Sequence, residues 1–320
     1  MKITIGYRLA PMALTLALLG AGAVVLYLGA EAAVRGAAGL SSALRIPAFA
    51  LGALLFGVDL EGLGAAVVAA GRGQTEIAAG ESFGTILFLF SVALGGALLL
   101  STRPLPSPSP AMVALPALPV VACALAISDR FVSRWEGALL VVIYMGYVVM
   151  VLLRGEGAGA ERVQRGGSPE TPATWRGAGL LTAVGIVLVY VGATLLVAGG
   201  GRLVDLTALS AGFVGAAVVG ILVSLDEVLL EVIPIRRGEP ELATGNLFGT
   251  LAAFTTGVPG LAALVRPLIL DGVVAAAYLA VALLYFVVGT WFLTRGRAGR
   301  LLGATVLGLY AVWLALASRV

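Results

Sequence analysis

The chain has 320 residues, of which 60% are hydrophobic and only 12% are charged, and its formal net charge is +3. A soluble domain carries about twice that charged fraction, so the composition indicates a helical membrane protein with several spans. The sequence has no histidine and one cysteine, which excludes histidine-ligated zinc sites, Ser-His-Asp triads and intrachain disulfides. The excess of arginine is distributed over the loops and does not indicate a nucleic-acid partner.

Ten apolar runs are read as membrane-spanning helices, since one span needs about 20 residues. In chain order they lie near residues 12–34, 46–70, 78–101, 111–127, 136–153, 177–199, 208–233, 243–265, 272–293 and 301–318. The one long polar stretch separates the fifth run from the sixth. We therefore expect an all-α protein with a five-helix repeat at 1–153, a linker at 154–176 and a second five-helix repeat at 177–320.

The distribution of basic residues predicts the orientation in the membrane, because inner loops carry an excess of Lys and Arg. If the N-terminus faces outward, 12 of the 20 basic residues lie on the inner side. The other 8 lie on the outer side: Lys2, Arg8, Arg72, Arg130, Arg134, Arg202, Arg266 and Arg319. We expect an inner-membrane protein with both termini outside and the linker in the cytoplasm.

The two halves share a segment. "RGQTEIAAGESFGTI" at 72–86 aligns without gaps with "RGEPELATGNLFGTL" at 237–251, at a constant offset of 165 residues. Five spans are an odd number, so the second half must be inserted upside down relative to the first. Inverted repeats are a recurrent transporter architecture, in which the substrate site lies near the midplane at interrupted helices in matching positions.

Each shared segment follows an acidic cluster within an apolar run. The first cluster is "FGVDLEGLG", with Asp59 and Glu61, and the second is "LVSLDEVLLE", with Ser224, Asp226, Glu227 and Glu231. A carboxylate at the bilayer centre costs about 2.5–3.5 kcal/mol on insertion scales, so two such clusters indicate a functional site. The alternative is a structural polar network or helix-end charges that reach the interface, and we expect that role for Glu31, Glu76 and Glu241.

The available ligands are carboxylate, amide and hydroxyl oxygens, which suit hard cations such as Ca²⁺ and Na⁺. Ser224 and Glu227 are spaced i, i+3 and share one face of a helix. Asp59 and Glu61 converge only if their helix is broken, which the neighbouring glycines permit. The glycines of the two hexamers, "GESFGT" at 80–85 and "GNLFGT" at 245–250, allow helices to approach closely and carry Glu81 and Asn246 toward the acids.

These features resemble the calcium/cation antiporter superfamily, close to the prokaryotic sodium/calcium exchangers. The likeness rests on the inverted layout, the segment "LYLGAEAAVRGAAGLSSAL" and the paired hexamers. Each repeat of that family runs roughly G-T-S-x-P-E and, about 18 residues later, G-N-x-x-G-S-N. Four residues of the second repeat fall on motif positions of the family: Ser224, Glu227, Asn246 and Thr250.

The first repeat departs from that motif. Asp59 replaces its serine, Glu61 its proline and Glu81 its asparagine, while Gly62 stands at the glutamate position. Further departures are Asp226 at the proline of the second repeat and, at the later Asn/Asp positions of the two repeats, Leu89 and Phe254.

The resemblance implies a secondary antiporter that exchanges Ca²⁺ or a related cation for Na⁺ or H⁺ by alternating access. It implies no enzymatic activity and no cofactor, with inorganic cations and membrane lipid as partners. Glu61, Asp226 and Glu227 would form the charged core of the site. The supporting ligands would be Asp59, Glu81, Thr85, Ser224, Asn246 and Thr250.

Repulsion between neighbouring carboxylates makes protons suitable counter-ions. Three other functions stay open at this point. One is a non-transporting regulator that descends from the exchanger fold, and the second is a simple channel. The third is an intramembrane aspartyl protease that uses Asp59 and Asp226, since two facing carboxylates can activate water.

Overall fold

The computed structural model describes residues 3–57, 59–101, 104–154, 174–206 and 225–317. Within them, six helices are long and apolar enough to cross a membrane: Met12–Leu44, Thr75–Leu100, Arg134–Leu153, Trp175–Leu196, Pro240–Val265 and Val274–Arg295. Shorter apolar helices cover Gly62–Gly71, Pro110–Ala126 and Arg300–Leu316. Together they match the expected runs, except that the run near 208–233 is described only from Leu225 onward. The linker prediction falls mostly on 155–173, outside the described residues.

The first half is a series of helices with a break before α3 and two extended connections. Its elements are α1 (Ile3–Leu44), α2 (Ala48–Leu51), the π-helix η1 (Gly52–Phe56), α3 (Leu60–Gly71), α4 (Thr75–Phe88), the π-helix η2 (Leu89–Ala93), α5 (Leu94–Leu100), α6 (Pro110–Ala114), α7 (Ala117–Ala126) and α8 (Arg134–Arg154). Pro110 begins α6, where a missing N–H costs nothing, and the Ser109 hydroxyl caps the Met112 amide.

The second half follows the same plan. Its described elements are α10 (Trp175–Leu206), α13 (Leu225–Arg237), α14 (Pro240–Ala252), the π-helix η4 (Ala253–Gly257), α15 (Val258–Val265), α16 (Gly272–Arg295) and α17 (Arg300–Ala317). The two hexamers occupy equivalent helices, α4 and α14. A π-turn follows each of them, and the 165-residue offset places Leu89 and Phe254 in these turns. Such turns occur frequently at functional sites.

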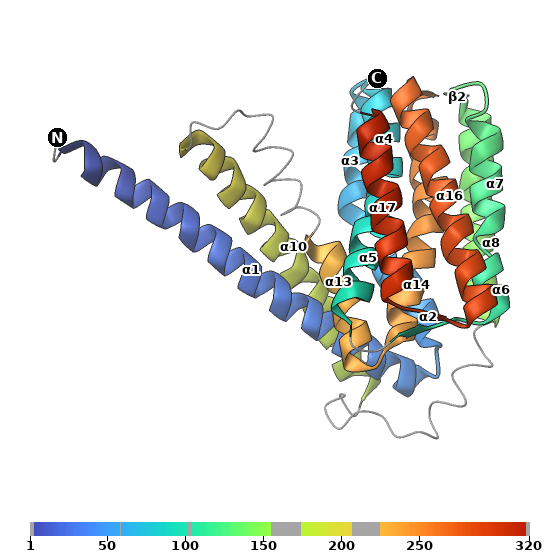
Figure 1. Ribbon diagram of the computed structural model, residues 1–320, viewed down its shortest axis with the longest axis horizontal. Coiled ribbons are helices and arrows are strands. Elements are labelled where there is room, and N and C mark those ends of the chain that lie inside the picture. Colours follow the sequence, from blue (N-terminus) through green and yellow to red (C-terminus); the bar gives the residue numbers. More distant parts are fainter. Residues whose placement is uncertain (1–2, 58, 102–103, 155–173, 207–224, 318–320) are drawn as a thin grey trace.

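Two small sheets join the halves. The strand β1 (Leu105–Pro106) pairs with β4 (Arg297–Ala298), and β2 (Phe131–Val132) pairs with β3 (Leu268–Ile269). β2 lies at the end of the bundle near the C-terminus, whereas β1, which precedes α6, lies at the opposite end (Figure 1). Shifted by the offset, β1 falls within two residues of β3 and β4 within one residue of β2, so the strand pairs agree with the inverted symmetry.

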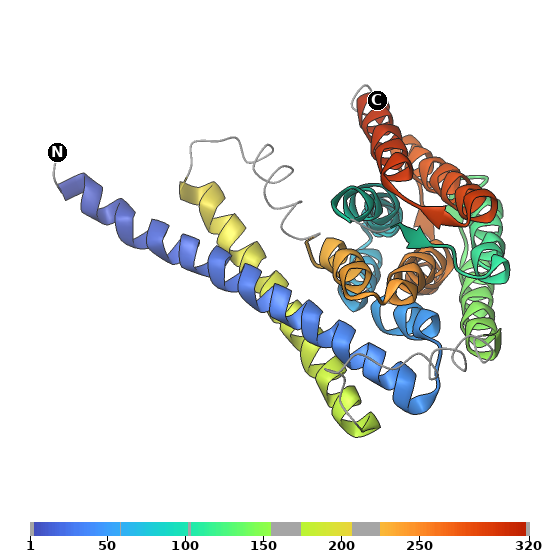
Figure 2. The same cartoon turned by 60° about the horizontal axis from the view of Figure 1, so that its bottom comes forward.

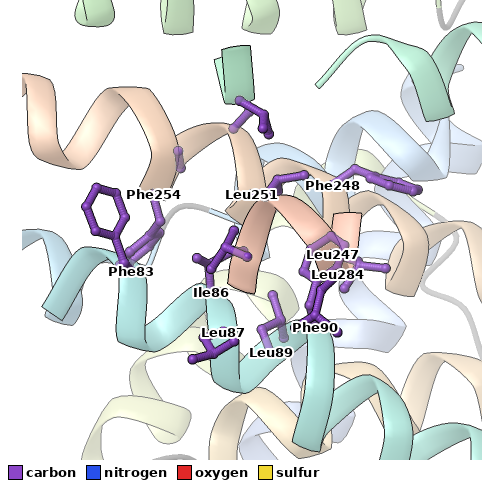
Figure 3. Close-up of a cluster of buried hydrophobic side chains, with 14 of the residues drawn as sticks. Phe83, Ile86, Leu87, Leu89, Phe90, Leu247, Phe248, Leu251, Phe254 and Leu284 are labelled. Carbon is purple, nitrogen blue, oxygen red and sulfur yellow. The ribbon is translucent and has the colours of Figure 1, made fainter. Parts of the chain in front are cut away.

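The core lies where α4–η2 crosses α14–η4. Figure 3 shows the side chains that these two segments contribute, among them Phe83 and Phe90 from one and Phe248 and Phe254 from the other. All four are fully buried, and the rings of Phe90 and Phe248 meet edge to face at 6.2 Å between centroids. The equivalent helices of the two halves therefore form the centre of the molecule.

The helices α1 and α10 form a separate antiparallel pair that projects from the bundle (Figures 1 and 2). With 42 and 32 residues, they are about 63 and 48 Å long. Glycines spaced seven apart line their contact: Gly22, Gly29 and Gly36 on α1, and Gly185, Gly192 and Gly199 on α10. A Cβ on Gly185 would lie 2.2 Å from the Ala33 amide nitrogen, so the two backbones touch as in other small-residue membrane contacts.

Candidate cation site

The expected break in the second membrane segment is present. The helix formed by α2 and η1 ends at Phe56, and α3 begins at Leu60. Asp59 lies directly before α3, and its backbone carbonyl accepts a hydrogen bond from the Leu63 amide at 3.0 Å. The positive end of the helix dipole therefore favours its carboxylate.

The side chains of Asp59 and Phe254 both lie next to Gly62. A Cβ on Gly62 would lie 2.6 Å from Asp59 Oδ2 and 2.9 Å from Phe254 Cζ. The carboxylate of Asp59 thus occupies the space into which a side chain at position 62 would project. Phe254 belongs to η4, so the π-turn of the second half packs beside Gly62, which follows the break of the first half.

Leu89 and Phe254 stand at the later Asn/Asp positions of the family motif, and neither side chain can act as a ligand. Leu89 and Phe254 are fully buried within the core. The hydroxyls that follow Phe254 bond back to their own helix, since Thr255 and Thr256 donate to the carbonyls of Leu251 and Ala252, each at 2.6 Å. Neither π-turn therefore supplies a side-chain ligand at its motif position.

A buried polar chain links α13 to α14. Asn246 Nδ2 donates to Glu231 Oε1 at 3.0 Å, and Thr250 Oγ1 donates to Asn246 Oδ1 at 3.5 Å. Glu231 is 0% exposed, Asn246 3% and Thr250 4%. The second carboxylate oxygen, Glu231 Oε2, is buried and has no hydrogen-bond partner in the part of the chain that the structure describes.

The hydrogen-bonded series from Glu231 to Thr250 ends close to the helix break of the first half. A Cβ on Gly57 would lie 2.8 Å from the Thr250 amide nitrogen. Phe254, whose ring lies beside Gly62 as Asp59 Oδ2 does, lies one helical turn beyond Thr250. The described polar residues therefore form one region, which runs from Glu231 through Asn246 and Thr250 to the break at 57–59.

The two acids before Glu231 begin the helix α13. Asp226 and Glu227 lie in its first turn and are half-buried. The helix dipole favours carboxylates at that position, as it does for Asp59. Glu231 follows Glu227 by four residues, and this spacing on one helix face was the sequence signal that could have added Glu231 to the candidate ligands.

The glycines of the second hexamer allow the close approach that the sequence predicts. A Cβ on Gly245 would lie 2.1 Å from the Phe49 carbonyl oxygen, and one on Gly249 would lie 2.4 Å from Ala53 Cα. Their counterparts in the first hexamer differ. The nearest described atom to a Cβ on Gly80 is 3.7 Å away, and no described atom lies within 4 Å of one on Gly84.

The predicted ligands fall into three groups. The structure brings Asn246 and Thr250 together with Glu231, and it places Asp59 beside Phe254. It describes Asp226, Glu227 and Thr85 as half-buried residues of α13 and α4. The side chains of Glu61, Glu81 and Ser224 lie outside the described part of the molecule. Among the described side chains, no three of the acidic and cysteine residues lie together as a metal-binding group.

Comparison with known families identifies the architecture. Residues 14–153 and 178–319 match the family model of the sodium/calcium exchanger proteins. The chain belongs to this family. It is a membrane protein and a cation antiporter, and its family consists of transporters rather than enzymes.

Two relatives have 26% identity with the chain. CaxA of Alkalimonas amylolytica, provisionally named an antiporter, aligns over 266 residues, which are 79% of this chain and 82% of CaxA. The inner membrane protein YrbG of Escherichia coli strain K12 aligns over 320 residues, which are 95% of this chain and 97% of YrbG. Nearly the whole chain is therefore shared with these relatives.

The fold is that of a solved exchanger. The sodium-calcium exchanger NCX_Mj, soaked with 10 mM Na⁺ and 10 mM Sr²⁺, superimposes with a TM-score of 0.81 at 20% identity over 95% of this chain and 98% of that one. The same protein soaked without Na⁺ and Ca²⁺ gives a TM-score of 0.80 at 19% identity. The inverted-repeat fold of the exchangers is thus the fold of this chain.

Proposed function

We propose that the chain moves Ca²⁺, or a divalent cation of similar size, across the membrane in exchange for Na⁺ or H⁺. One observation carries this proposal: Asp59 Oδ2 lies 2.6 Å from the position of a Cβ on Gly62. Position 62 is where the family motif has its glutamate. The carboxylate lost from position 62 is thus replaced in space by the carboxylate of Asp59, so the site keeps its charge although its sequence has changed.

The ligand chemistry supports a hard cation. All candidate ligands are oxygens, namely those of Asp59, Glu61, Glu81, Thr85, Ser224, Asp226, Glu227, Asn246 and Thr250. Carboxylates from both halves would supply the negative charge, and the hydroxyls and the amide would replace part of the hydration shell. The names of the relatives, an exchanger of sodium and calcium among them, support the same ion class.

We also propose that the protein lies in the inner membrane with both termini outside. The excess of basic residues in the inner loops supports this orientation, and the name of the relative YrbG, an inner membrane protein, supports the location. The 154–176 segment would then lie in the cytoplasm. Reaction of single introduced cysteines in this segment and at the C-terminus with a membrane-impermeant maleimide, in whole cells and after lysis, tests the orientation.

The test of function is ⁴⁵Ca²⁺ uptake into proteoliposomes that contain the purified full chain. One set of vesicles carries an outward Na⁺ gradient, and the other an outward H⁺ gradient. We expect uptake driven by one gradient and not by the other, which identifies the coupling ion. A parent protein that takes up no Ca²⁺, Sr²⁺ or other divalent cation under either gradient would favour a non-transporting descendant of the fold.

A double variant of two assigned ligands tests their role in uptake. The double variant Asp226→Asn, Glu227→Gln keeps the size of both side chains but removes two negative charges. We expect it to lose uptake and to stay folded, because both residues are only half-buried at a helix end. Uptake equal to that of the parent would remove these two residues from the site.

A further inference from the structure

We propose that Glu231, Asn246 and Thr250 form a binding site for a single alkali cation, with Na⁺ as its ligand and Glu231 Oε2 as the vacant ligand atom. This inference rests on the proposed cation exchange and adds a residue to its site. Glu231 is absent from the ligand set that the motif predicts, because it lies one turn beyond the motif glutamate position at Glu227.

Burial is the first argument. Glu231 is 0% exposed, and its only described hydrogen bond comes from Asn246 Nδ2 to Oε1. Burying an ionised carboxylate is costly unless an opposite charge compensates it. The described ion pairs of the nearby helices join Arg35 and Arg237 to Glu31. They leave Glu231 Oε2 without a hydrogen-bond partner in the described chain.

The number and kind of ligands indicate the ion. Glu231 offers one negative charge, and Asn246 and Thr250 can offer one oxygen each. Ca²⁺ takes six to eight oxygens, and no group of three acidic or cysteine side chains lies together among the described residues. One carboxylate with two neutral oxygens matches a monovalent cation in charge. The Asn246 amide must turn its oxygen toward the ion, and its carbonyl and amino ends have similar size.

The symmetry of the chain provides an independent argument. The offset relates Glu231 to Ala66 and Asn246 to Glu81. At these two positions each half carries one acid, but on opposite partners: Glu231 on α13 in the second half and Glu81 on α4 in the first. Ala66 is fully buried, so the first half has no carboxylate at the position of Glu231. The alkali cation site therefore belongs to the second half alone.

The position of the site connects it to transport. Thr250 is the last residue of the polar chain, and its amide nitrogen lies 2.8 Å from the position of a Cβ on Gly57. Gly57 begins the break that carries Asp59. An ion bound at Glu231 would therefore lie beside the segment that holds the proposed divalent cation.

The test measures Na⁺-dependent thermal stability of the purified full chain in detergent. Na⁺ replaces N-methylglucamine at constant ionic strength, so only specific binding raises the unfolding temperature. We expect the parent to be stabilised and Glu231→Gln to need at least tenfold more Na⁺ for the same shift. Glu76→Gln, an exposed residue in the first turn of α4, is the control and should respond like the parent.

A second variant keeps the test decisive if Glu231→Gln does not fold. Asn246→Asp places a second carboxylate beside Glu231, so we expect stabilisation by Ca²⁺ to increase relative to stabilisation by Na⁺. Unchanged responses to both ions would overturn the site. A parent that shows no Na⁺-dependent shift would overturn it as well.

Flux measurements separate this inference from the proposed function. If the parent exchanges cations while Glu231→Gln binds Na⁺ as the parent does, the site is refuted and exchange stands. If the parent binds Na⁺ through Glu231 but moves no divalent cation under any gradient, the site stands and the proposed divalent exchange is refuted.

Discussion

The two hexamers have four letters in common, yet their helices are packed differently. In α14, every residue from Leu242 to Ala252 is buried, and Gly245 and Gly249 touch the backbone of α2 and η1. In α4, Gly84 is exposed and meets no described atom within 4 Å. A repeated sequence therefore forms the same helix in both halves, whereas the tightness of packing depends on the partner that each helix meets.

The same contrast extends to the polar residues. The tightly packed half holds Asn246 and Thr250 in a buried chain with Glu231. In the first half, Thr85 is a half-buried residue of α4. Asp59, the candidate acidic ligand whose side chain is described there, lies at a helix break. We infer that packing fixes the described ligands Asn246 and Thr250 of the second half, and that a helix break positions Asp59 in the first half.

The largest expected effect comes from filling the tight contact. Gly245→Ala and Gly249→Ala each force a methyl group against the backbone of α2 or η1, where the distances of 2.1 and 2.4 Å leave no space. Overpacking of this kind costs about 1–3 kcal/mol of unfolding free energy, and more where backbone must move. Gly80→Ala and Gly84→Ala, at the equivalent positions, should be nearly neutral. Thermal unfolding of the four variants in detergent checks the difference.

Equal stabilities for Gly249→Ala and Gly84→Ala would contradict the comparison. A loss of stability in Gly84→Ala as large as that in Gly249→Ala would mean that the first hexamer is also tightly packed, against residues outside the described part.

A smaller effect is expected at the junction of the halves. Gly62→Ala places a methyl group 2.6 Å from Asp59 Oδ2 and 2.9 Å from Phe254 Cζ, so the carboxylate must turn away. Because only side-chain ends move, we expect a loss of about 1 kcal/mol in stability and a severalfold weaker apparent affinity for the divalent cation in the uptake assay. Gly64→Ala, with no described atom within 4 Å, is the control. Unchanged affinity in Gly62→Ala would separate Asp59 from the site.

The smallest effect concerns the attachment of the α1–α10 pair to the bundle. Glu31 on α1 forms ion pairs with Arg35 on the same helix and with Arg237 at the end of α13. Glu31→Gln should lower the unfolding free energy by about 1 kcal/mol, since the pair is only partly buried. A double-mutant cycle with Arg237→Gln, repeated at high salt, measures the coupling. Full additivity of the two changes would show that the pair contributes nothing.

The role expected for Glu31 from the sequence was that of a helix-end charge without a binding function, and the ion pairs agree with a structural role. By the offset, the position equivalent to Glu31 is Leu196, and that equivalent to Arg237 is Arg72. The second half therefore lacks the acid that would pair with Arg72 of the first half. This asymmetry, like the packing of the hexamers, follows from single residues and not from the repeat.

Much of the fold could be predicted from the sequence because membrane helices need long apolar runs and because the gap-free repeat at 72–86 and 237–251 reveals the symmetry. The sequence indicated that Asp59 and Glu61 converge only if their helix is broken, which the neighbouring glycines permit, and the structure shows a helix that ends at Phe56 and another that begins at Leu60. The π-turns after both hexamers were not predicted, since they contain ordinary apolar residues and depend on tertiary packing.

The site was harder to predict because side-chain position depends on three-dimensional contacts. The motif drew attention to Glu227, while the fully buried acid is Glu231, one turn farther along α13. The substitution of Gly62 suggested a lost ligand, but only the structure places Asp59 in the same space. The assignments of Glu61, Glu81 and Ser224 stay predictions, because their side chains lie outside the described part.

The most direct test of exchange follows both ions in one set of proteoliposomes. Vesicles loaded with ⁴⁵Ca²⁺ are diluted into Ca²⁺-free medium, with the potential clamped by K⁺ and valinomycin, while ²²Na⁺ entry and internal pH are recorded. Antiport predicts that each Ca²⁺ that leaves is matched by a fixed number of Na⁺ or H⁺ that enter. Ca²⁺ efflux balanced by K⁺ alone, with no entry of Na⁺ or H⁺, would contradict exchange and indicate a channel.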